Sequence, residues 1–182
     1  ADEVMRRVVN PVIDGMRAEG VPYIGFLYAG LMLTPAGPKV IEFNARFGDP
    51  EAQVVLPLID GSFVALLAAA AAGDLSGVRL AVSRDCTVGV VMASRGYPAS
   101  AESGREIHGL ARASAVPGAL VFHSGTRAEH GHVATAGGRV LTVTGRGTTY
   151  EAAMATAYAA VGTIEFDGMQ FRTDIGRKAI AV

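Results

Sequence analysis

The chain has 182 residues, of which 50% are hydrophobic and 18% are charged, and its formal net charge at pH 7 is −1. This length suits one large domain or two small ones, and the hydrophobic content is ample for a core. The near-neutral charge, the absence of Trp and an aromatic content of 7% give neither a basic surface nor a stacking platform, so we expect no nucleic-acid partner.

Membrane spanning and secretion are not expected either. The longest apolar stretch, from Phe63 to Ala72, is about half of the ~20 residues that a membrane helix needs. The N-terminus has no basic segment followed by an apolar run, as a signal peptide would. A single cysteine, Cys86, cannot form an internal disulfide, which fits a reducing compartment. These features predict a cytoplasmic location.

The first predicted element is a helix from Asp2 to Glu19 that ends at Gly20. Its apolar residues recur every four positions, at Val4, Val8, Val12 and Met16. Pro11 lies inside this pattern and should kink or interrupt the helix, because proline has no N–H to donate.

Two β-rich segments follow, Tyr23–Leu33 and Lys39–Phe47, with turn-forming residues between Thr34 and Pro38. They are expected to pair as an antiparallel hairpin. If the second strand is regular, its residues alternate between two faces. The polar face carries Val40, Glu42, Asn44 and Arg46. The apolar face, which suits a core, carries Ile41, Phe43, Ala45 and Phe47.

The polar residues of the second strand are candidate ligands for a metal and an anion. Polar side chains spaced by two in an apolar segment are costly to bury without a partner. Glu42 and Asn44 offer two adjacent oxygen ligands, which suit Mg²⁺ shared with a nucleotide phosphate. Arg46 could hold a phosphate or carboxylate in bidentate fashion. The structural alternative is a buried edge strand with an internal Glu–Arg pair.

A turn and further helices follow this strand. Asp49 is a favourable N-cap and Pro50 a favourable first helical residue, so the helix start could hold an anion beside the metal. The helical region from Pro50 to Ala72 should break near Leu56, because Pro57 follows. Residues 73–77 read as a linker, which predicts two domains, residues 1–75 and 76–182.

The second domain is predicted to be small and β-rich, with one packed helix. The expected strands are Thr87–Ser94, Leu120–Arg127 and Arg139–Thr144, and the expected helix is Thr149–Gly162. Ala152, Ala155 and Ala159 give that helix a face of small residues for close packing. The fold class is therefore α+β with antiparallel sheet.

The longer string from Val40 to Gln53 closely resembles the signature of the phosphoribosylamine–glycine ligase family, also called glycinamide ribonucleotide synthetase. The resemblance extends to other segments on both sides of it. These are Gly20–Met32, Gly89–Ala93, Gly96–Pro98, Phe122–Thr126, Gly137–Leu141 and Arg172–Gly176. It implies the C-terminal half of an ATP-grasp domain followed by the family's small C-terminal domain.

The resemblance also implies a reaction: ATP-dependent joining of glycine to 5-phosphoribosylamine through glycyl phosphate, in purine biosynthesis. Glu42 and Asn44 resemble the ligands of Mg²⁺ or Mn²⁺, and Leu31 and Ile41 resemble residues that flank the adenine of ATP. Arg46 would act on the transferred phosphoryl group or the acyl phosphate, and with Gly48 and Asp49 would contact substrate. Many ATP-grasp enzymes have a further metal-binding Glu on the upstream strand, but near Ala29 this chain has no carboxylate.

Two other interpretations remain open at this point. One is a non-catalytic β-rich module used for packing or assembly, and the other is a different ATP-grasp ligase. Family members are more than twice as long, so the resemblance predicts that this chain is a C-terminal portion. We expect it to be inactive without an N-terminal remainder, which would be its partner.

Overall fold

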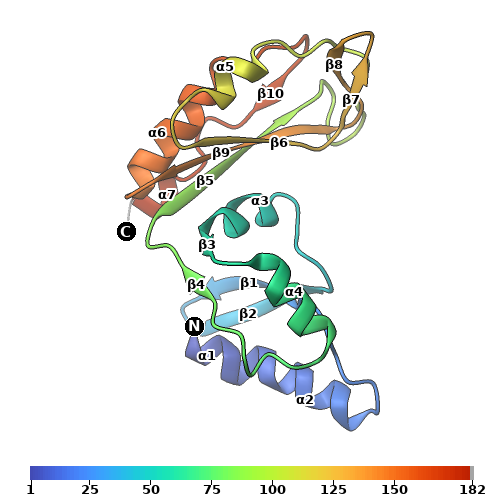
Figure 1. Cartoon of the computed structure of the whole chain (residues 1–182), viewed down its shortest axis with the longest axis vertical. Helices are drawn as coiled ribbons and strands as arrows, with labels where there is room; N and C mark the ends of the chain where they lie inside the picture. Colours follow the sequence, from blue (N-terminus) through green and yellow to red (C-terminus); the bar gives the residue numbers. More distant parts are fainter. Residues whose placement is uncertain (181–182) are drawn as a thin grey trace. The chain divides into compact units, whose positions relative to one another are not determined.

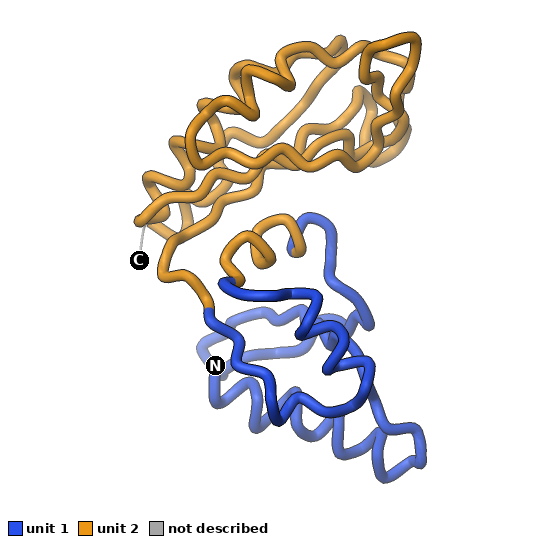
Figure 2. The backbone as a smooth tube through the Cα atoms, viewed as in Figure 1, with its two compact units in different colours: residues 1–51, 60–81 blue, residues 52–59, 82–182 orange. Residues whose placement is uncertain are grey.

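The computed structural model describes residues 1–180, which form two compact units (Figures 1 and 2). Of the described residues, the first unit comprises residues 1–51 and 60–81, and the second comprises residues 52–59 and 82–180. Within residues 1–180, no helix is long and apolar enough to cross a membrane. The division at residues 75 and 76 that the sequence suggests stays a prediction, and the contacts group residues 52–59 with the C-terminal sheet.

The first unit begins with a continuous helical segment, as expected for residues 2–19. It consists of α1 (Asp2–Val4), a π-helical turn η1 (Met5–Val9) and α2 (Asn10–Ala18). The predicted interruption is the π-helical turn, which ends two residues before Pro11. Gly20 closes the helix with φ of +79°, a conformation that glycine adopts without steric cost.

The predicted hairpin is confirmed as β1 (Tyr28–Thr34) and β2 (Gly37–Asn44), which pair antiparallel. Its alternation is not regular. The register shifts so that Gly30 pairs with Glu42 but Leu31 pairs with Val40, which leaves Ile41 without a cross-strand partner. The expectation that Val40 shares a face with Glu42 is therefore wrong, because a β-bulge inserts one residue between them.

The predicted apolar core face of β2 is also wrong in part. Ile41 is 63% exposed and Phe43 is 42% exposed. The reason is that β1 and β2 form a sheet of only two strands within residues 1–180. Phe47, which follows the strand, is half-buried and is the member of that set that packs against other aromatic rings.

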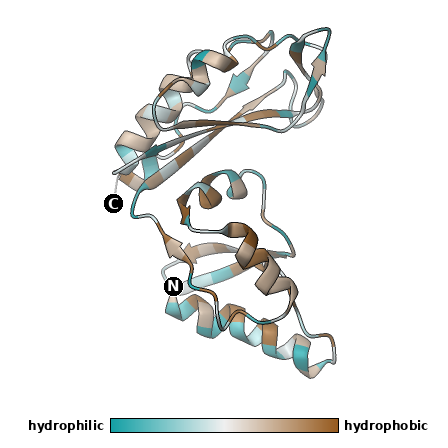
Figure 3. Cartoon of the chain, viewed as in Figure 1, coloured by the Kyte–Doolittle hydropathy of each residue, from teal (hydrophilic) through white to brown (hydrophobic). Residues whose placement is uncertain are grey.

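The helical region after the turn breaks where Pro57 predicted. It is divided into α3 (Glu51–Val55), the 3-10 turn η2 (Leu56–Leu58), the short strand β3 (Ile59–Asp60) and α4 (Phe63–Ala71). The Ser62 hydroxyl accepts a hydrogen bond from the Ala65 backbone N–H at 3.1 Å and so caps α4. Every residue of α4 is hydrophobic (Figure 3).

The second unit is built on a four-stranded antiparallel sheet in the order β10, β5, β9, β6 (Figure 1). These strands are β5 (Cys86–Ala93), β6 (Ala119–His123), β9 (Arg139–Gly147) and β10 (Gln170–Phe171). A separate hairpin comprises β7 (Thr126–Glu129) and β8 (His132–Thr135), and β4 is Ala81–Val82. The strand expected over Leu120–Arg127 is therefore two strands, because the chain turns at Ser124 and Gly125.

The second unit also contains the helices α5 (Leu110–Ser114), α6 (Tyr150–Val161) and α7 (Arg177–Ile180). The predicted helix α6 is confirmed, with Thr149 as its N-cap. Its buried residues are Ala153, Ala157, Ala160 and Val161. A Cβ on Gly145 of β9 would overlap the backbone of Ala153 and Ala157, so the strand and the helix approach closely because small residues line both.

Residues 52–59 belong to the second unit because α3 and η2 are hydrogen-bonded to its sheet. The Thr87 hydroxyl donates to the Val54 carbonyl at 2.7 Å, and the Thr144 hydroxyl donates to the Gln53 carbonyl at 3.0 Å. In a continuing helix the Gln53 carbonyl would accept a hydrogen bond from the backbone N–H of residue 57. That residue is Pro57, which has no N–H. Thr144 replaces that missing donor.

Gly89 on β5 makes this packing possible. A Cβ at Gly89 would lie 2.7 Å from Cγ1 of Val54. We predict that Gly89→Ala lowers the free energy of unfolding by about 1–3 kcal/mol, because α3 must shift from the sheet. Thermal unfolding followed by circular dichroism measures the change. Gly77→Ala, at a position with no atom within 4 Å of the added Cβ, is the control and should change little.

Candidate functional site

The candidate metal ligands Glu42 and Asn44 lie together at the end of β2. The Asn44 side-chain N–H donates to Glu42 Oε1 at 3.1 Å, so the two head groups are neighbours. Opposite Glu42 on β1 is Gly30, where a Cβ would lie 3.0 Å from Cγ of Glu42. The absence of a side chain at Gly30 therefore gives Glu42 its space.

The geometry of this pair fits a divalent metal ion. Because Asn44 Nδ2 donates to Glu42 Oε1, the side-chain amide oxygen Oδ1 of Asn44 and Oε2 of Glu42 can face a cation. Carboxylate and amide oxygens are the ligand types that Mg²⁺ and Mn²⁺ accept. Glu42 is exposed, so the remaining coordination positions can be filled by water or by phosphate oxygens.

Arg46 lies two residues beyond the end of β2 and is exposed. Its Nη1 donates to the Phe47 carbonyl at 3.2 Å. Among residues 1–180, neither Glu42 nor any other carboxylate forms an ion pair with it. The structural alternative of a buried strand with an internal Glu–Arg pair is therefore not what the structure contains, and the guanidinium has donors left for an anionic ligand.

The two residues expected beside the adenine differ in their surroundings. Leu31 is half-buried and pairs with Val40, whereas Ile41 is at the bulge and is mostly exposed. Both present hydrophobic surface on the hairpin that also carries Glu42 and Asn44. Their contact with adenine stays a prediction.

The turn that follows differs from the expected helix start. The Asp49–Pro50 peptide bond is cis, and α3 begins at Glu51. The prediction that Pro50 is the first helical residue is therefore wrong, and the binding of an anion at this helix start stays a prediction. Gly48 is buried and Asp49 is exposed, and their contact with substrate stays a prediction.

The structure adds two residues that the sequence analysis did not single out, Tyr28 and Glu51. The Tyr28 hydroxyl lies 3.5 Å from Glu51 Oε1, a long hydrogen bond. Burial, followed by the charges of Glu51 and Glu42, raises the pKa of Tyr28 above its ordinary value. The hydroxyl is the donor of this hydrogen bond, because an ionised carboxylate only accepts. The sequence contains no local signal for this contact, because the two residues lie 23 positions apart.

A cluster of three aromatic rings, Phe26, Phe47 and Phe63, packs beside the turn that follows β2. The ring centroids of Phe26 and Phe47 are 4.4 Å apart, and those of Phe47 and Phe63 are 6.4 Å apart. Such contacts add about 0.5–1.5 kcal/mol per pair to the burial of the rings. Phe47 therefore anchors the chain between Arg46 and Gly48.

We predict that Phe47→Ala lowers the unfolding free energy of the first unit by about 1–3 kcal/mol, because two ring contacts are lost. Phe43→Ala is the matched control on the exposed face of β2 and should cost less than about 0.5 kcal/mol. Urea unfolding of the 182-residue chain and its variants gives both values. Equal destabilisation by the two substitutions would contradict the assignment of Phe47 as the anchor.

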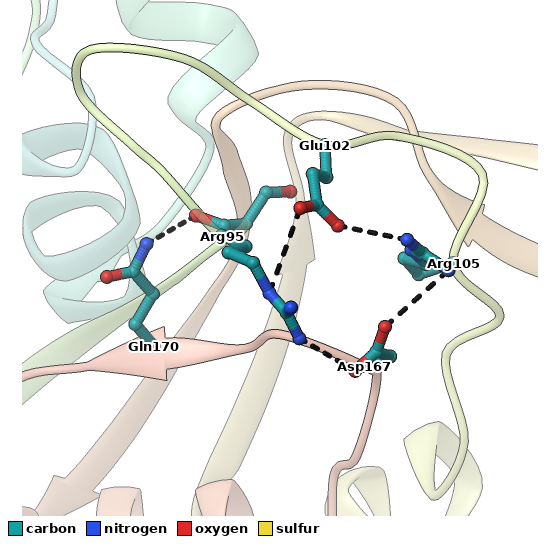
Figure 4. A network of polar contacts seen from close by, with 6 residues as sticks. Arg95, Glu102, Arg105, Asp167 and Gln170 are labelled. Atoms are coloured by element: carbon teal, nitrogen blue, oxygen red, sulfur yellow. Dashed lines mark hydrogen bonds and ion pairs between the residues drawn. The ribbon is translucent and has the colours of Figure 1, made fainter.

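A second polar cluster, in the C-terminal unit, is structural. Arg95 and Arg105 alternate with Glu102 and Asp167 (Figure 4), and the two shortest N–O distances, Arg95–Asp167 and Arg105–Glu102, are both 3.0 Å. Two guanidinium groups and two carboxylates balance, so no charge is left for a ligand. These half-exposed pairs contribute at most about 1 kcal/mol each and join the loop from residue 95 to 105 to the turn at Asp167.

Comparisons with known proteins show which family this chain resembles. The family "Phosphoribosylglycinamide synthetase, C domain" matches residues 87–178, and "Phosphoribosylglycinamide synthetase, ATP-grasp (A) domain" matches residues 1–52. A curated phosphoribosylamine–glycine ligase from Streptomyces coelicolor is 49% identical over 181 residues, which are 98% of this chain and 44% of the relative. A trifunctional purine biosynthetic protein adenosine-3 from Gallus gallus is 47% identical over 98% of this chain and 18% of its own length.

A solved structure also matches. The crystal structure of phosphoribosylamine–glycine ligase from Thermotoga maritima superposes with a TM-score of 0.81 at 34% identity, over 96% of this chain and 42% of that chain. The chain thus spans less than half the length of these relatives.

The match of residues 1–52 to an ATP-grasp domain places the hairpin that carries Glu42 and Asn44 in an ATP-grasp protein, as the resemblance predicted. The C domain match covers half of the chain, and the chain belongs to the phosphoribosylglycinamide synthetase family. The expected α+β fold class is confirmed by the same matches.

Proposed function

We propose that this chain is the C-terminal part of a ligase of purine biosynthesis that joins glycine to 5-phosphoribosylamine with consumption of ATP. The observation that carries the proposal is the adjacent pair of oxygen ligands on Glu42 and Asn44, with the guanidinium of Arg46, which forms no ion pair among residues 1–180, just beyond them. Relatives that are named phosphoribosylamine–glycine ligase support the choice of reaction.

In this proposal the candidate residues on the hairpin and just after it have roles in phosphoryl transfer. Glu42 and Asn44 hold Mg²⁺ or Mn²⁺, and Leu31 and Ile41 flank the adenine. The metal ion, when bound, neutralises charge on the ATP phosphates. Arg46 is the catalytic residue that stabilises the transferring phosphoryl group or the glycyl phosphate. Gly48 and Asp49 shape the substrate end of the site.

Further parts of the proposal concern the whole protein. The N-terminal remainder that the relatives possess would provide the other half of the nucleotide site, so the chain alone would be inactive. The enzyme would act in the cytoplasm. Residues 1–75 would complete the ATP-grasp domain, and residues 76–182 would form the C-terminal domain.

A chimera tests the function directly. In the Streptomyces coelicolor relative, the segment that matches this chain is replaced by residues 1–182. We predict that the purified chimera forms glycinamide ribonucleotide from glycine, 5-phosphoribosylamine and ATP, in a reaction that requires a divalent metal. A folded chimera without this activity would contradict the proposal, and activity with a different amine would favour another ATP-grasp ligase.

We predict that Glu42→Ala lowers the turnover of the chimera by a factor of about 100 or more, because a metal ligand is lost. Its unfolding temperature should be unchanged, since Glu42 is exposed. Glu19→Ala, an exposed glutamate after α2, is the control and should retain full activity. Near-normal turnover of the Glu42 variant at millimolar Mg²⁺ would show that Glu42 does not hold the metal.

A further inference from the structure

Glu51 has no role in the function proposed above, although it ends the same polar stretch. It is half-buried and is the first residue of α3. Its carboxylate is directed to the turn that precedes the helix: a Cβ built on Gly48 would overlap the Glu51 carboxyl group. Any other residue at position 48 would displace the carboxylate, so the position of the Glu51 carboxylate depends on Gly48.

Tyr28 holds this carboxylate from the other side. Its hydroxyl donates to Glu51 Oε1, and its position on β1 is fixed by pairing with Asn44. The Tyr28 ring also lies near Gly30, where a Cβ would be 3.6 Å from the ring. Tyr28 therefore connects Glu51 to the strand pair that carries Glu42 and Asn44.

The charge of this region favours a cationic ligand group. From Glu42 to Glu51 there are three carboxylates, Glu42, Asp49 and Glu51, and one guanidinium, Arg46, which gives a formal charge of −2. A metal ion at Glu42 and Asn44 is one cation that this charge can accept. Among residues 1–180, Tyr28 donates to Oε1 of Glu51, and Oε2 lies beside the Gly48 turn. A carboxylate that accepts one bond from a fixed neutral donor is suited to an ammonium or amine N–H.

We propose that Glu51 binds the amino group of a substrate and that Tyr28 is the positioning residue that orients its carboxylate. The ligand class is a small primary amine, which in the reaction proposed above is either glycine or 5-phosphoribosylamine. The inference rests on that proposed function, because it assigns the amine end of the same site. Arg46 would then face the acidic end of the reactants and Glu51 the amine end.

Steady-state kinetics of the chimera test the assignment, with KM measured separately for ATP, glycine and 5-phosphoribosylamine. We expect Glu51→Gln to raise KM for one amine substrate about tenfold or more, since a charge-assisted hydrogen bond is lost. KM for ATP should stay within about twofold. Tyr28→Phe should raise the same KM about threefold or more, and Glu51→Asp should restore part of the loss. The substrate whose KM changes identifies which amine Glu51 binds.

Tyr23→Phe is the matched control for Tyr28. It also removes a tyrosine hydroxyl of the first unit, one that donates to the Phe26 carbonyl at 2.6 Å. It should lower the unfolding temperature without a change in any KM. Gly48→Ala supplies an independent variant, because its methyl group displaces the Glu51 carboxylate and should raise the same KM as Glu51→Gln.

The outcomes separate the two proposals. An inactive but folded parent chimera contradicts the proposed function, and the inference falls with it. An active chimera in which Glu51→Gln and Tyr28→Phe leave the amine KM values unchanged, or only lower the unfolding temperature as Tyr23→Phe does, overturns the inference alone. Equal increases of KM for ATP and for the amines would also overturn it, because that result indicates a general distortion of the turn.

Discussion

The hydrogen bond from Asn44 to Glu42 depends on the antiparallel pairing of β1 with β2, and the rest of the site depends on that pairing. The pairing places Gly30 opposite Glu42 and Tyr28 opposite Asn44. Two polar head groups on one short strand would have no fixed separation if the strand were not held in register. Because Gly30 has no side chain, the Glu42 side chain has space across the strand pair, and Tyr28 lies opposite Asn44.

The same physical device, a glycine where another group approaches the backbone, recurs through the molecule. Gly48 admits the Glu51 carboxylate, Gly89 admits the side chain of Val54, and Gly145 admits helix α6. At each of these positions the missing Cβ allows another group to pack closely against the backbone. The high glycine and alanine content of the chain therefore has a structural use at particular contacts.

The sequence predicted the elements whose signals are local. Turn residues from Thr34 to Pro38 indicated the hairpin, Pro57 indicated the break after α3, and Thr149 began the last long helix. What the sequence could not show depends on neighbours distant in the chain. The bulge at Ile41 is set by cross-strand register. The Tyr28–Glu51 contact joins residues 23 positions apart, and no periodicity reveals such a pair.

The most direct test of the metal assignment is a calorimetric titration. Mg²⁺ and a non-hydrolysable ATP analogue are added together to the chimera with the Streptomyces coelicolor relative, and to its Asn44→Ala variant. If Glu42 and Asn44 hold the metal with the nucleotide, the parent binds the pair and the variant binds it at least about tenfold more weakly, with an unchanged unfolding temperature. Equal affinity in the two proteins would contradict the account, because the polar end of β2 would then have a structural role only.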